Sequence, residues 1–264
     1  MYVFNAASIM PKGMMAACIR HLVEYVDEFL IVESVDPKAK MFGPDGKSTD
    51  DTEQIVLGMR QKWPQIKWKP IGSIKAKEDR YAASNRIMQG DYVWLLDADE
   101  FYHEKDIPLL LKLLEDRRPY VVNYYANHFW GDWNHRVKHI KGQSWGNGPW
   151  FRIFKNNPGR SYWIENAPPL YMYEDGILCN DQKNRIDADE LLEMGIKLYH
   201  YGFVQKSQID FKHVFYQGGA DYQSLWSEWQ KNHNASIVLG TKTVPFDQSG
   251  HPLVIRKLIH ENRH

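Results

Sequence analysis

The stretch Tyr92–Lys105, YVWLLDADEFYHEK, decides the fold of this chain. It opens with a continuous apolar run, which is typical of a strand buried on both faces in a parallel sheet. The carboxylates Asp97 and Asp99 follow at the point where such a strand leaves the core. Ligands of open α/β sheets bind at these carboxyl ends, so the stretch predicts both a central strand and a binding edge.

The two carboxylates of this stretch also predict a kind of ligand. Residues two apart on an extended strand point the same way, so Asp97 and Asp99 would repel each other unless a cation or a donor lay between them. Mg²⁺ typically binds through one or two carboxylates together with phosphate oxygens. The pattern therefore favours a divalent cation; a solvated acidic turn that closes a strand is the open alternative.

The tetrapeptide DADE occurs a second time, at Asp187–Glu190 within RIDADELLEMG. No apolar run precedes this copy. Asp187 stands at an N-cap position and Glu190 follows three residues later, which is the capping-box spacing. Carboxylates at a helix start are also favoured by the helix dipole. The second copy therefore predicts a helix start, and the first copy predicts the site.

Strand-like and helix-like segments alternate through the first 120 residues, which predicts an α/β fold with a single mixed, mostly parallel sheet flanked by helices. The predicted strands are Tyr2–Phe4, Glu28–Ser34, 66–72, 91–99 and 119–125, and the predicted helices are Met14–Val26, Asp51–Lys62, Asp79–Met88 and Ile107–Leu114. Residues 127–180 are rich in Trp, Tyr, Gly, Asn and Pro and lack periodicity, so we expect a long irregular segment there, which is usually functional. Residues 205–229 predict a helical C-terminal extension.

The composition narrows the class of protein. The 264 residues are 43% apolar and 14% aromatic, which is enough for the core of one large domain or of a domain with a smaller appendage. The 33 basic and 33 acidic side chains balance, which argues against a nucleic-acid binder that works by bulk charge. Two distant cysteines without CxxC spacing argue against a disulfide framework or a zinc site.

The sequence also bears on membranes and on compartment. No apolar stretch approaches the roughly 20 residues that span a bilayer. The opening residues MYVFNAASIMPKG lack the basic segment and long apolar core of a signal peptide. We therefore expect a cytoplasmic protein without a transmembrane segment, while peripheral membrane contact and a homodimer stay open.

Six segments, taken in order, resemble family 2 glycosyltransferases and their relatives with the A-type nucleotide-diphospho-sugar transferase fold. They are DEFLIVES (Asp27–Ser34), DGKSTDDT (Asp45–Thr52), the stretch Asp79–Glu100, RIFKNNPG (Arg152–Gly159), WIENAPPL (163–170) and LYHYG (Leu198–Gly202). The resemblance covers residues 1–205 and implies a nucleotide-sugar-binding catalytic domain there, with residues 206–264 as a helical extension packed on it. The loop between Ser34 and Ser48 is longer than the family's usual tight turn.

The resemblance implies an activity and the two groups that this activity requires, a divalent cation and a general base. A sugar would move from a nucleotide-diphosphate donor to an acceptor hydroxyl, with inversion. A divalent cation, Mn²⁺ or Mg²⁺, would neutralise the departing diphosphate, and a carboxylate would take the proton of the hydroxyl as general base. The acceptor stays open among a glycan, a lipid-linked sugar, a protein and a small molecule.

The resemblance implies that Asp99 binds the metal and that His200 is a third ligand. Asp97 would contact the ribose or the metal shell. The alternative for His200, which is flanked by Tyr199 and Tyr201, is a buried strand histidine hydrogen-bonded to backbone.

Four further residues are implied at the nucleotide. Glu33 and Asp36 would contact the nucleobase and its ribose, and Arg80 and Asn85 would contact the diphosphate or the base. Taken without the resemblance, the first two are charges at a strand end and the last two are ordinary helix-surface residues.

The general base has two candidates. Glu165 lies beside Trp163 and Ile164, where partial desolvation would raise the pKa of its carboxyl. Asp175 follows Glu174 and precedes a glycine, and it is the second choice. A solvent-facing loop glutamate and a plain turn are the respective alternatives.

Aromatic residues form the last group of candidates. The segment Asn127–His135, with Trp145, Trp150 and Trp163, predicts either a sugar-acceptor cleft or a small satellite core, because aromatic faces stack on the apolar faces of sugar rings. Trp226 and Trp229, three apart on a predicted helix, favour packing or an interface.

Three rival functions remain at this point. A sugar nucleotidyltransferase would need a glycine-rich, basic phosphate loop near the N-terminus, where FNAASIMPKG offers only Gly13 and Lys12. A carbohydrate- or nucleotide-sugar-binding protein would use the aromatic face without transfer. Hydrolysis of the nucleotide sugar would need the same residues as transfer.

Overall fold

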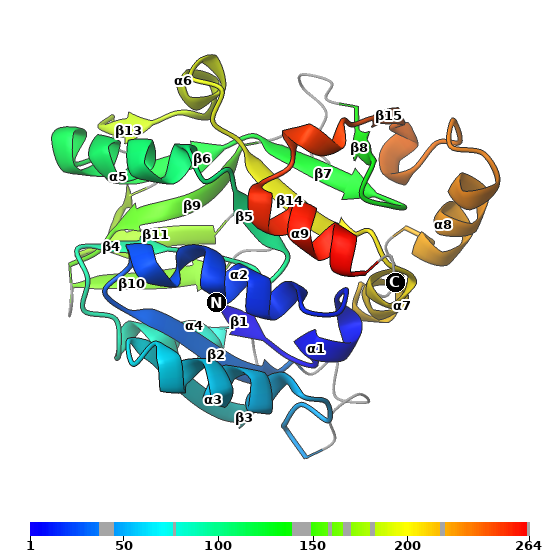
Figure 1. Cartoon of the computed structure of the whole chain (residues 1–264). Coiled ribbons are helices and arrows are strands. Elements are labelled where there is room, and N and C mark those ends of the chain that lie inside the picture. Colours follow the sequence, from blue (N-terminus) through cyan, green and yellow to red (C-terminus); the bar gives the residue numbers. More distant parts are fainter. Residues whose placement is uncertain are drawn as a thin grey trace.

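The computed structural model describes residues 1–36, 45–75, 78–138, 149–157, 160–165, 170–179, 183–216 and 220–262. Both backbone and side chains are described, except that the description is limited to the backbone for Glu78, Arg80, Tyr81, Asn85, Leu239 and residues 161–165 and 170–172. Strands occupy the middle of the molecule and helices lie outside them (Figure 1).

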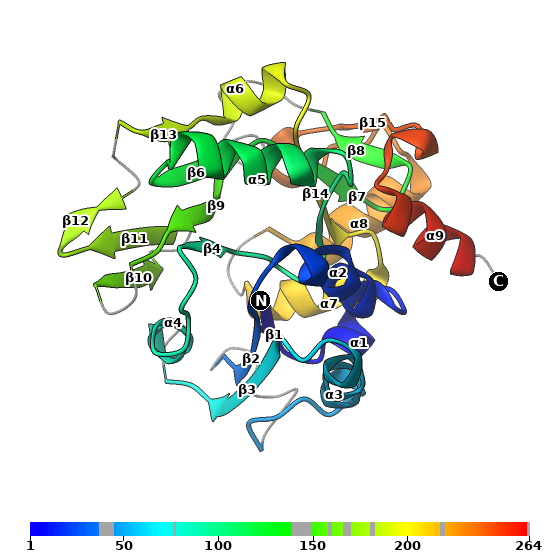
Figure 2. The same ribbon diagram turned by 60° about the vertical axis from the view of Figure 1, so that its left-hand side comes forward.

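A parallel three-stranded sheet in the order β1-β2-β3 holds the N-terminal strands β1 (Tyr2–Val3), β2 (Phe29–Val35) and β3 (Ile66–Ser73). The apolar run predicted as a buried strand is β2, in which Ile31 and Val32 are almost fully buried. Parallel neighbours need long crossover connections, and here the crossover contains a helix. Figure 2 shows β2 and β3 between α3 (Thr52–Lys62) and α4 (Glu78–Asn85).

The remaining strands form three further sheets. One has the order β13-β6-β9-β4, with β4 (Tyr92–Trp94), β6 (Val121–Tyr124), β9 (Trp150–Lys155) and β13 (Arg185–Ile186). A second has the order β15-β8-β7-β14-β5, with β5 (Glu100–Tyr102), β7 (Ala126–Trp130), β8 (His135–Val137), β14 (Leu198–Phe203) and β15 (Thr243–Pro245). A third contains β10 (Ser161–Glu165), β11 (Leu170–Glu174) and β12 (Ile177–Leu178).

The predicted α/β class, with mixed strands flanked by helices, is confirmed. The described strands are divided among four hydrogen-bonded sheets rather than one, and antiparallel pairs predominate beyond β3. The central strand is also shorter than predicted: β4 ends at Trp94, and the chain turns through Asp97 before β5 begins at Glu100. The backbone N–H of Glu100 donates to the carbonyl of Asp97 at 3.0 Å, which closes this turn.

The prediction that residues 127–180 are irregular is wrong for the part that the structure describes, because it contains strands β7 to β12. Aromatic side chains fit the pleated surface of a sheet, and strands buried on both faces show no alternation that a sequence pattern could reveal. The structural role of this aromatic-rich segment is therefore pairing, with β9 between β4 and β6.

The second DADE begins α6 (Ala188–Glu193), as predicted, but the expected capping box does not form. The carboxylate of Asp187 instead accepts hydrogen bonds from Arg185 and Asn123, and Glu190 pairs with Arg117 of α5 (Asp106–Arg117). Cationic partners thus outcompete the backbone N–H groups for these carboxylates. None of these contacts reaches the first DADE.

The other helices lie at the two ends of the chain. They are α1 (Ala6–Ile9), α2 (Met14–Leu22) and η1 (Val23–Tyr25), and then α7 (Lys206–Phe215), α8 (Tyr222–Lys231), η4 (Val238–Gly240), η5 (Gln248–Gly250) and α9 (Leu253–Glu261). Helix α9 packs on α2, and β15 joins β8 at the sheet edge. Trp226 and Trp229 are buried in an apolar cluster with Trp130, so they serve packing. In the described part of the chain, no helix has the length and apolarity that crossing a bilayer requires.

We expect acid to weaken the attachment of the C-terminal segment through His251. Its Nδ1 lies 2.8 Å from the hydroxyl of Tyr201 in β14, its ring is fully buried, and burial lowers its pKa to about 4. Because the unfolded chain takes up this proton near pH 6.5, the contribution is complete above that pH and is lost as the pH falls to about 4. Each pKa unit corresponds to about 1.4 kcal/mol, so the loss approaches roughly 3 kcal/mol.

Urea unfolding of wild type and of His251→Gln between pH 4 and 7 measures this effect. The variant should be less stable at pH 7 and should have the flatter pH profile. Parallel profiles for the two proteins would contradict the assignment.

Candidate active site

The carboxyl ends of β2 and β4 meet at one cavity of about 540 Å³. Asp36 follows β2, and Asp97 and Asp99 follow β4. His200 reaches the same cavity from β14. Such cavities lie in the size range of small-molecule sites. The structure therefore brings four of the predicted site residues together.

Asp97 and Asp99 are held differently within this cavity. The carboxylate of Asp97 is 55% exposed, while the residue Asp99 is only 6% exposed. Burial raises the pKa of Asp99, against the opposing charges of Lys212 and Arg152. The backbone carbonyl of Asp99 accepts from the N–H of Tyr201 at 2.9 Å, which ties the turn to β14. The two carboxylates are thus an inner and an outer group of one turn.

Asp99 faces His200. Its Oδ1 lies 3.7 Å from Nε2 of His200, and a Cβ added at Gly202 would come within 2.5 Å of that nitrogen and 3.0 Å of Asp99 Oδ2. The missing side chain at Gly202 therefore leaves the space in which the two groups meet. The resemblance of the segment LYHYG to family 2 glycosyltransferases pointed to His200. The register of β14 against β5 explains its position, because it places His200 opposite Glu100.

His200 is paired on its other side with His128 of β7. The two Nδ1 atoms lie 2.8 Å apart, so one ring donates to the other. Burial lowers the pKa of both rings well below the usual value. His200 is therefore neutral at physiological pH, and the tautomer that donates from Nδ1 leaves a lone pair on Nε2 towards Asp99. No sequence pattern pointed to His128 beyond its place in the aromatic segment.

Arg152 and Glu100 form a buried ion pair beneath the turn. Arg152 donates to Glu100 through Nε at 2.9 Å and also through Nη2, and its Nη2 lies 3.3 Å from Asp97 Oδ2. Glu100 is fully buried, and its carboxylate accepts from the N–H of Asp97 at 3.2 Å. Burial raises the pKa of Glu100 to about 8, against the opposing charge of Arg152. The pair fixes the shape of the turn that presents Asp97 and Asp99.

The remaining predicted residues lie elsewhere or outside the description. Glu33 is buried, and its carboxylate accepts from the N–H of Ser48 at 2.9 Å, so it holds the loop before α3. Asp175 lies in the exposed turn between β11 and β12, where it pairs with Arg160, and it does not line the cavity.

Three predicted site residues have side chains outside the described part of the structure. The backbones of Arg80 and Asn85 belong to α4, and the backbone of Glu165 ends β10, opposite Leu170 of β11. Their contacts are therefore left to experiment.

Two residues of this cavity fit a divalent cation that a phosphate also contacts. Among the described residues, no three His, Cys, Asp or Glu side chains are gathered as a complete ligand set. Mg²⁺ and Mn²⁺ sites in phosphate chemistry, however, use one or two protein carboxylates with substrate oxygens, and imidazole is an accepted ligand for first-row metals. Asp99 and His200, which converge where Gly202 leaves room, meet that requirement.

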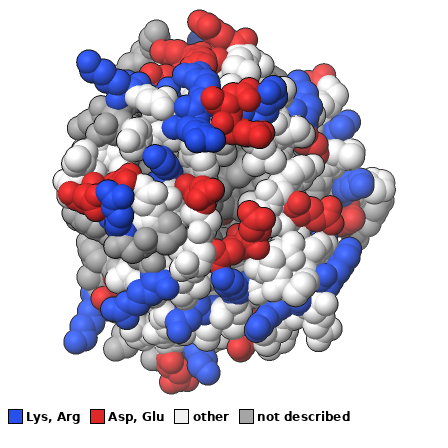
Figure 3. Space-filling view, turned by 90° about the vertical axis from the view of Figure 1, so that its left-hand side faces the viewer, with Lys and Arg blue, Asp and Glu red and all other residues white. Residues whose placement is uncertain are grey.

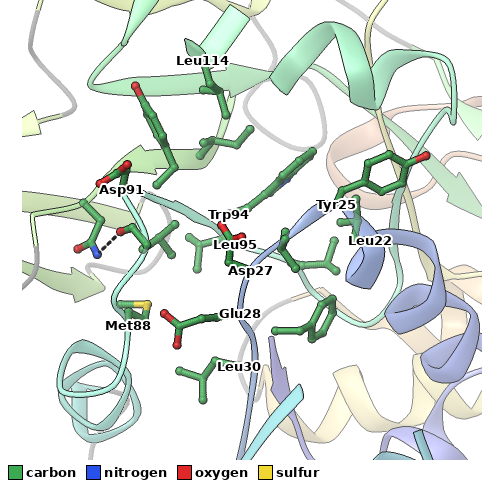
Figure 4. A pocket seen from close by; sticks show the side chains of 18 of the residues that line it. Leu22, Tyr25, Asp27, Glu28, Leu30, Met88, Asp91, Trp94, Leu95 and Leu114 are labelled. Atoms are coloured by element: carbon green, nitrogen blue, oxygen red, sulfur yellow. Dashed lines mark hydrogen bonds between the residues drawn. The ribbon is translucent and has the colours of Figure 1, made fainter. Parts of the chain in front are cut away.

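A second cavity, of about 740 Å³, lies at the other end of the strands. Its wall contains Leu30 near the start of β2 and Tyr92 at the start of β4, together with the mainly apolar side chains in Figure 4. None of the predicted site residues with described side chains lines it. The face in Figure 3 carries acidic and basic side chains in mixture, without a broad basic patch. The carboxyl-end cavity is therefore the candidate active site.

Comparison with known proteins agrees with this choice. Residues 40–166 match the model of "Glycosyl transferase family 2". This part of the chain is similar to family 2 glycosyltransferases. The family 2 segment includes the turn with Asp97 and Asp99, and also Arg152 and Glu165, while His200 and the C-terminal helices lie beyond it.

Solved structures similar to this chain share few residues with it. TarS 1–349 of S. aureus, in complex with UDP-GlcNAc, is 15% identical over 54% of this chain and 34% of its own, with a TM-score of 0.35. The mannosyltransferase PcManGT of Pyrobaculum calidifontis, in complex with GDP-Man and Mn²⁺, is 18% identical over 47% of this chain and 33% of its own, with a TM-score of 0.36. This chain thus matches about a third of the length of each. No curated protein sequence matches it.

Proposed function

We propose that this protein is a glycosyltransferase that moves a sugar from a nucleoside-diphosphate donor to an acceptor hydroxyl. One observation carries the proposal: Asp97, Asp99, Asp36 and His200 meet in one cavity at the carboxyl ends of the strands, in a chain of which residues 40–166 are similar to family 2 glycosyltransferases. Asp36, with Glu33 behind it, would contact the nucleoside, and Arg80 and Asn85 of α4 would contact the diphosphate or the base.

Asp99 and His200, with Asp97 at the rim, would hold Mn²⁺ or Mg²⁺. The bound ion would supply Lewis-acid neutralisation of the departing diphosphate. The chain's own residues prepare this position: Arg152 and Glu100 fix the turn, and His128 orients the ring of His200. A water-poor cavity strengthens each of these interactions.

Glu165 is the proposed general base, which takes the proton of the acceptor hydroxyl as that oxygen attacks the anomeric carbon. A single displacement of this kind inverts the configuration. Asp175 is the weaker candidate because its carboxylate is exposed and occupied by Arg160. Trp150, which lines the cavity, would stack on a sugar ring of the donor or acceptor. Residues 206–264 would act as an extension that packs on the catalytic part, residues 1–205.

Donor binding is the test of this function. A thermal-shift panel with UDP-, GDP-, dTDP- and CMP-sugars, each with and without Mn²⁺ or Mg²⁺, detects ligands that bind the native state. We expect metal-dependent stabilisation by one class of nucleoside-diphosphate sugar, with the monophosphate-linked CMP-sugar inert. A flat response across the panel would overturn the proposal and favour a carbohydrate-binding protein without transfer.

Glu165→Gln should keep donor binding and lose transfer. A general base contributes roughly a hundredfold or more to the rate, and the amide cannot take the proton. Calorimetry with the donor found by the panel, together with product formation, measures the two effects separately. Asp175→Asn is the matched comparison and should stay near wild type; turnover that survives in Glu165→Gln and falls in Asp175→Asn would exchange the two roles.

A further inference from the structure

Helix α7, which lies beyond the family 2 segment, forms one wall of the candidate active site. Gln208 and Lys212 of this helix line the same cavity as Asp97 and Asp99. The helix is fixed in place at its start: Gln208 donates to the carbonyl of Tyr201 at 2.8 Å, and Ser207 donates to that of Ile9 at 2.6 Å. A capping box between Gln205 and Gln208 rigidifies the same turn. The C-terminal extension therefore completes the cavity.

Lys212 is a cation in this wall, and it has no ionic partner among the described residues. Its Nζ lies 4.6 Å from the centre of the Phe203 ring, and the residue is partly buried. Among the side chains that the structure describes, no carboxylate forms an ion pair with it. Lys206, one and a half turns earlier on the same helix, is by contrast exposed and paired with Asp210. An ammonium that has lost part of its water gains from an aromatic face, but a negative group close by would stabilise it more.

Lys212 shares the candidate site with Asp99 and His200, the two groups that would hold the cation. Both groups lie in the cavity that Lys212 lines. A diphosphate bound beside Asp99 would therefore bring its negative charge to the position where Lys212 has influence.

We propose that Lys212 binds the diphosphate of the donor and stabilises it as it leaves. The inference rests on the proposed function and gives the helical extension a part in it. A lysine acts on phosphate as a point charge, so it would add to a divalent cation rather than replace it. Phe203 beneath the ammonium holds the side chain in the cavity.

Calorimetry on the full chain with Mn²⁺ present separates this role from a structural one. The probes are UDP, UMP and uridine, then GDP, GMP and guanosine, and then dTDP, dTMP and thymidine, so that phosphate number varies at constant base. Charge-assisted contacts of this kind change affinity by roughly ten- to a hundredfold. Lys212→Met should lose that factor for the diphosphate, less for the monophosphate and nothing for the nucleoside. Lys206→Met is the matched control and should bind all probes like wild type.

The outcomes are distinct. If wild type binds none of the three diphosphates, the proposed function fails and the inference fails with it. If wild type binds and Lys212→Met binds the diphosphate equally well, or loses all three probes by the same factor, only the inference fails. Lys212→Arg keeps the charge, and its affinity for the diphosphate should stay within a few-fold of wild type. The melting temperature of Lys212→Met shows whether that variant is folded, and Lys212→Arg provides the comparison if it is not. A loss of affinity in Lys212→Arg as large as that expected for Lys212→Met would overturn the role of the charge.

Discussion

Asp99→Asn should abolish metal-dependent stabilisation by the donor and lower the rate of transfer by at least roughly a thousandfold. The amide keeps the shape of Asp99 but removes the only buried carboxylate charge that faces His200 among the described residues. Without it, a divalent cation and the departing diphosphate lose their protein anchor, and metal-ion and electrostatic terms of this kind supply several kcal/mol in the transition state. The fold should survive, because burial already disfavours the charged form of Asp99.

The second DADE offers the matched control. Asp189→Asn makes the same chemical change in the same tetrapeptide, but Asp189 is exposed, and among the described residues its carboxylate accepts a hydrogen bond from Tyr125 alone. Donor binding and turnover of the Asp189→Asn variant should match those of wild type. Thermal shift with and without Mn²⁺, followed by product formation, measures both variants. Wild-type donor affinity in Asp99→Asn, or a large loss in Asp189→Asn, would mean that the first copy is not the site.

Arg152→Met should be the most destabilising change at the site. Glu100 is fully buried, and Arg152 supplies its only charged partner in the described structure. Where Glu100 is ionised, above about pH 8, removing Arg152 leaves a buried charge uncompensated, at a cost of about 3–5 kcal/mol. The double variant Glu100→Gln, Arg152→Met removes both charges and should recover a large part of that loss, as a double-mutant cycle measures.

The pH dependence adds a second check on Arg152→Met. The pKa of Glu100 in the folded state is already raised to about 8 by burial, and loss of the cation raises it further, while in the unfolded chain the carboxyl ionises near pH 4.5. Ionisation therefore favours unfolding, so both proteins should lose stability alike as the pH rises from about 4.5 to 8, and the variant should lose further ground against wild type only above about pH 8.

Urea unfolding followed by tryptophan fluorescence measures this series. Arg160→Met, which removes an exposed arginine paired with Asp175, is the control and should leave the midpoint unchanged. Equal midpoints for Arg152→Met and Arg160→Met would show that the pair beneath the turn is not a structural element.

Local sequence patterns predicted much of the secondary structure and the acidic residues at the centre of the candidate site. Helix periodicity gave α2, α3 and α5, and continuous apolar runs gave β2 and the start of β4. The contrast between the two DADE copies was readable because an apolar strand precedes only the first. Those signals are local, since each depends on residues within a few positions of one another.

The pairing of distant residues could not be read in this way. The aromatic segment became strands because β4, β6 and other distant strands offered partners, and Glu100 acquired Arg152 through the register of β9 beside β4. His128 met His200 because β7 and β14 run parallel in register. Such contacts depend on which strands become neighbours, and no periodicity within a segment encodes its neighbour.

The sequence by itself determined that this chain is an α/β protein with acidic side chains after its central strand. Only the tertiary structure decided which side chains surround that edge. The physical reason is that apolar periodicity fixes which face of an element is buried, whereas strand register and helix packing fix what that face meets. Lys212 illustrates the difference: it lies 113 positions after Asp99 in the sequence and lines the same cavity.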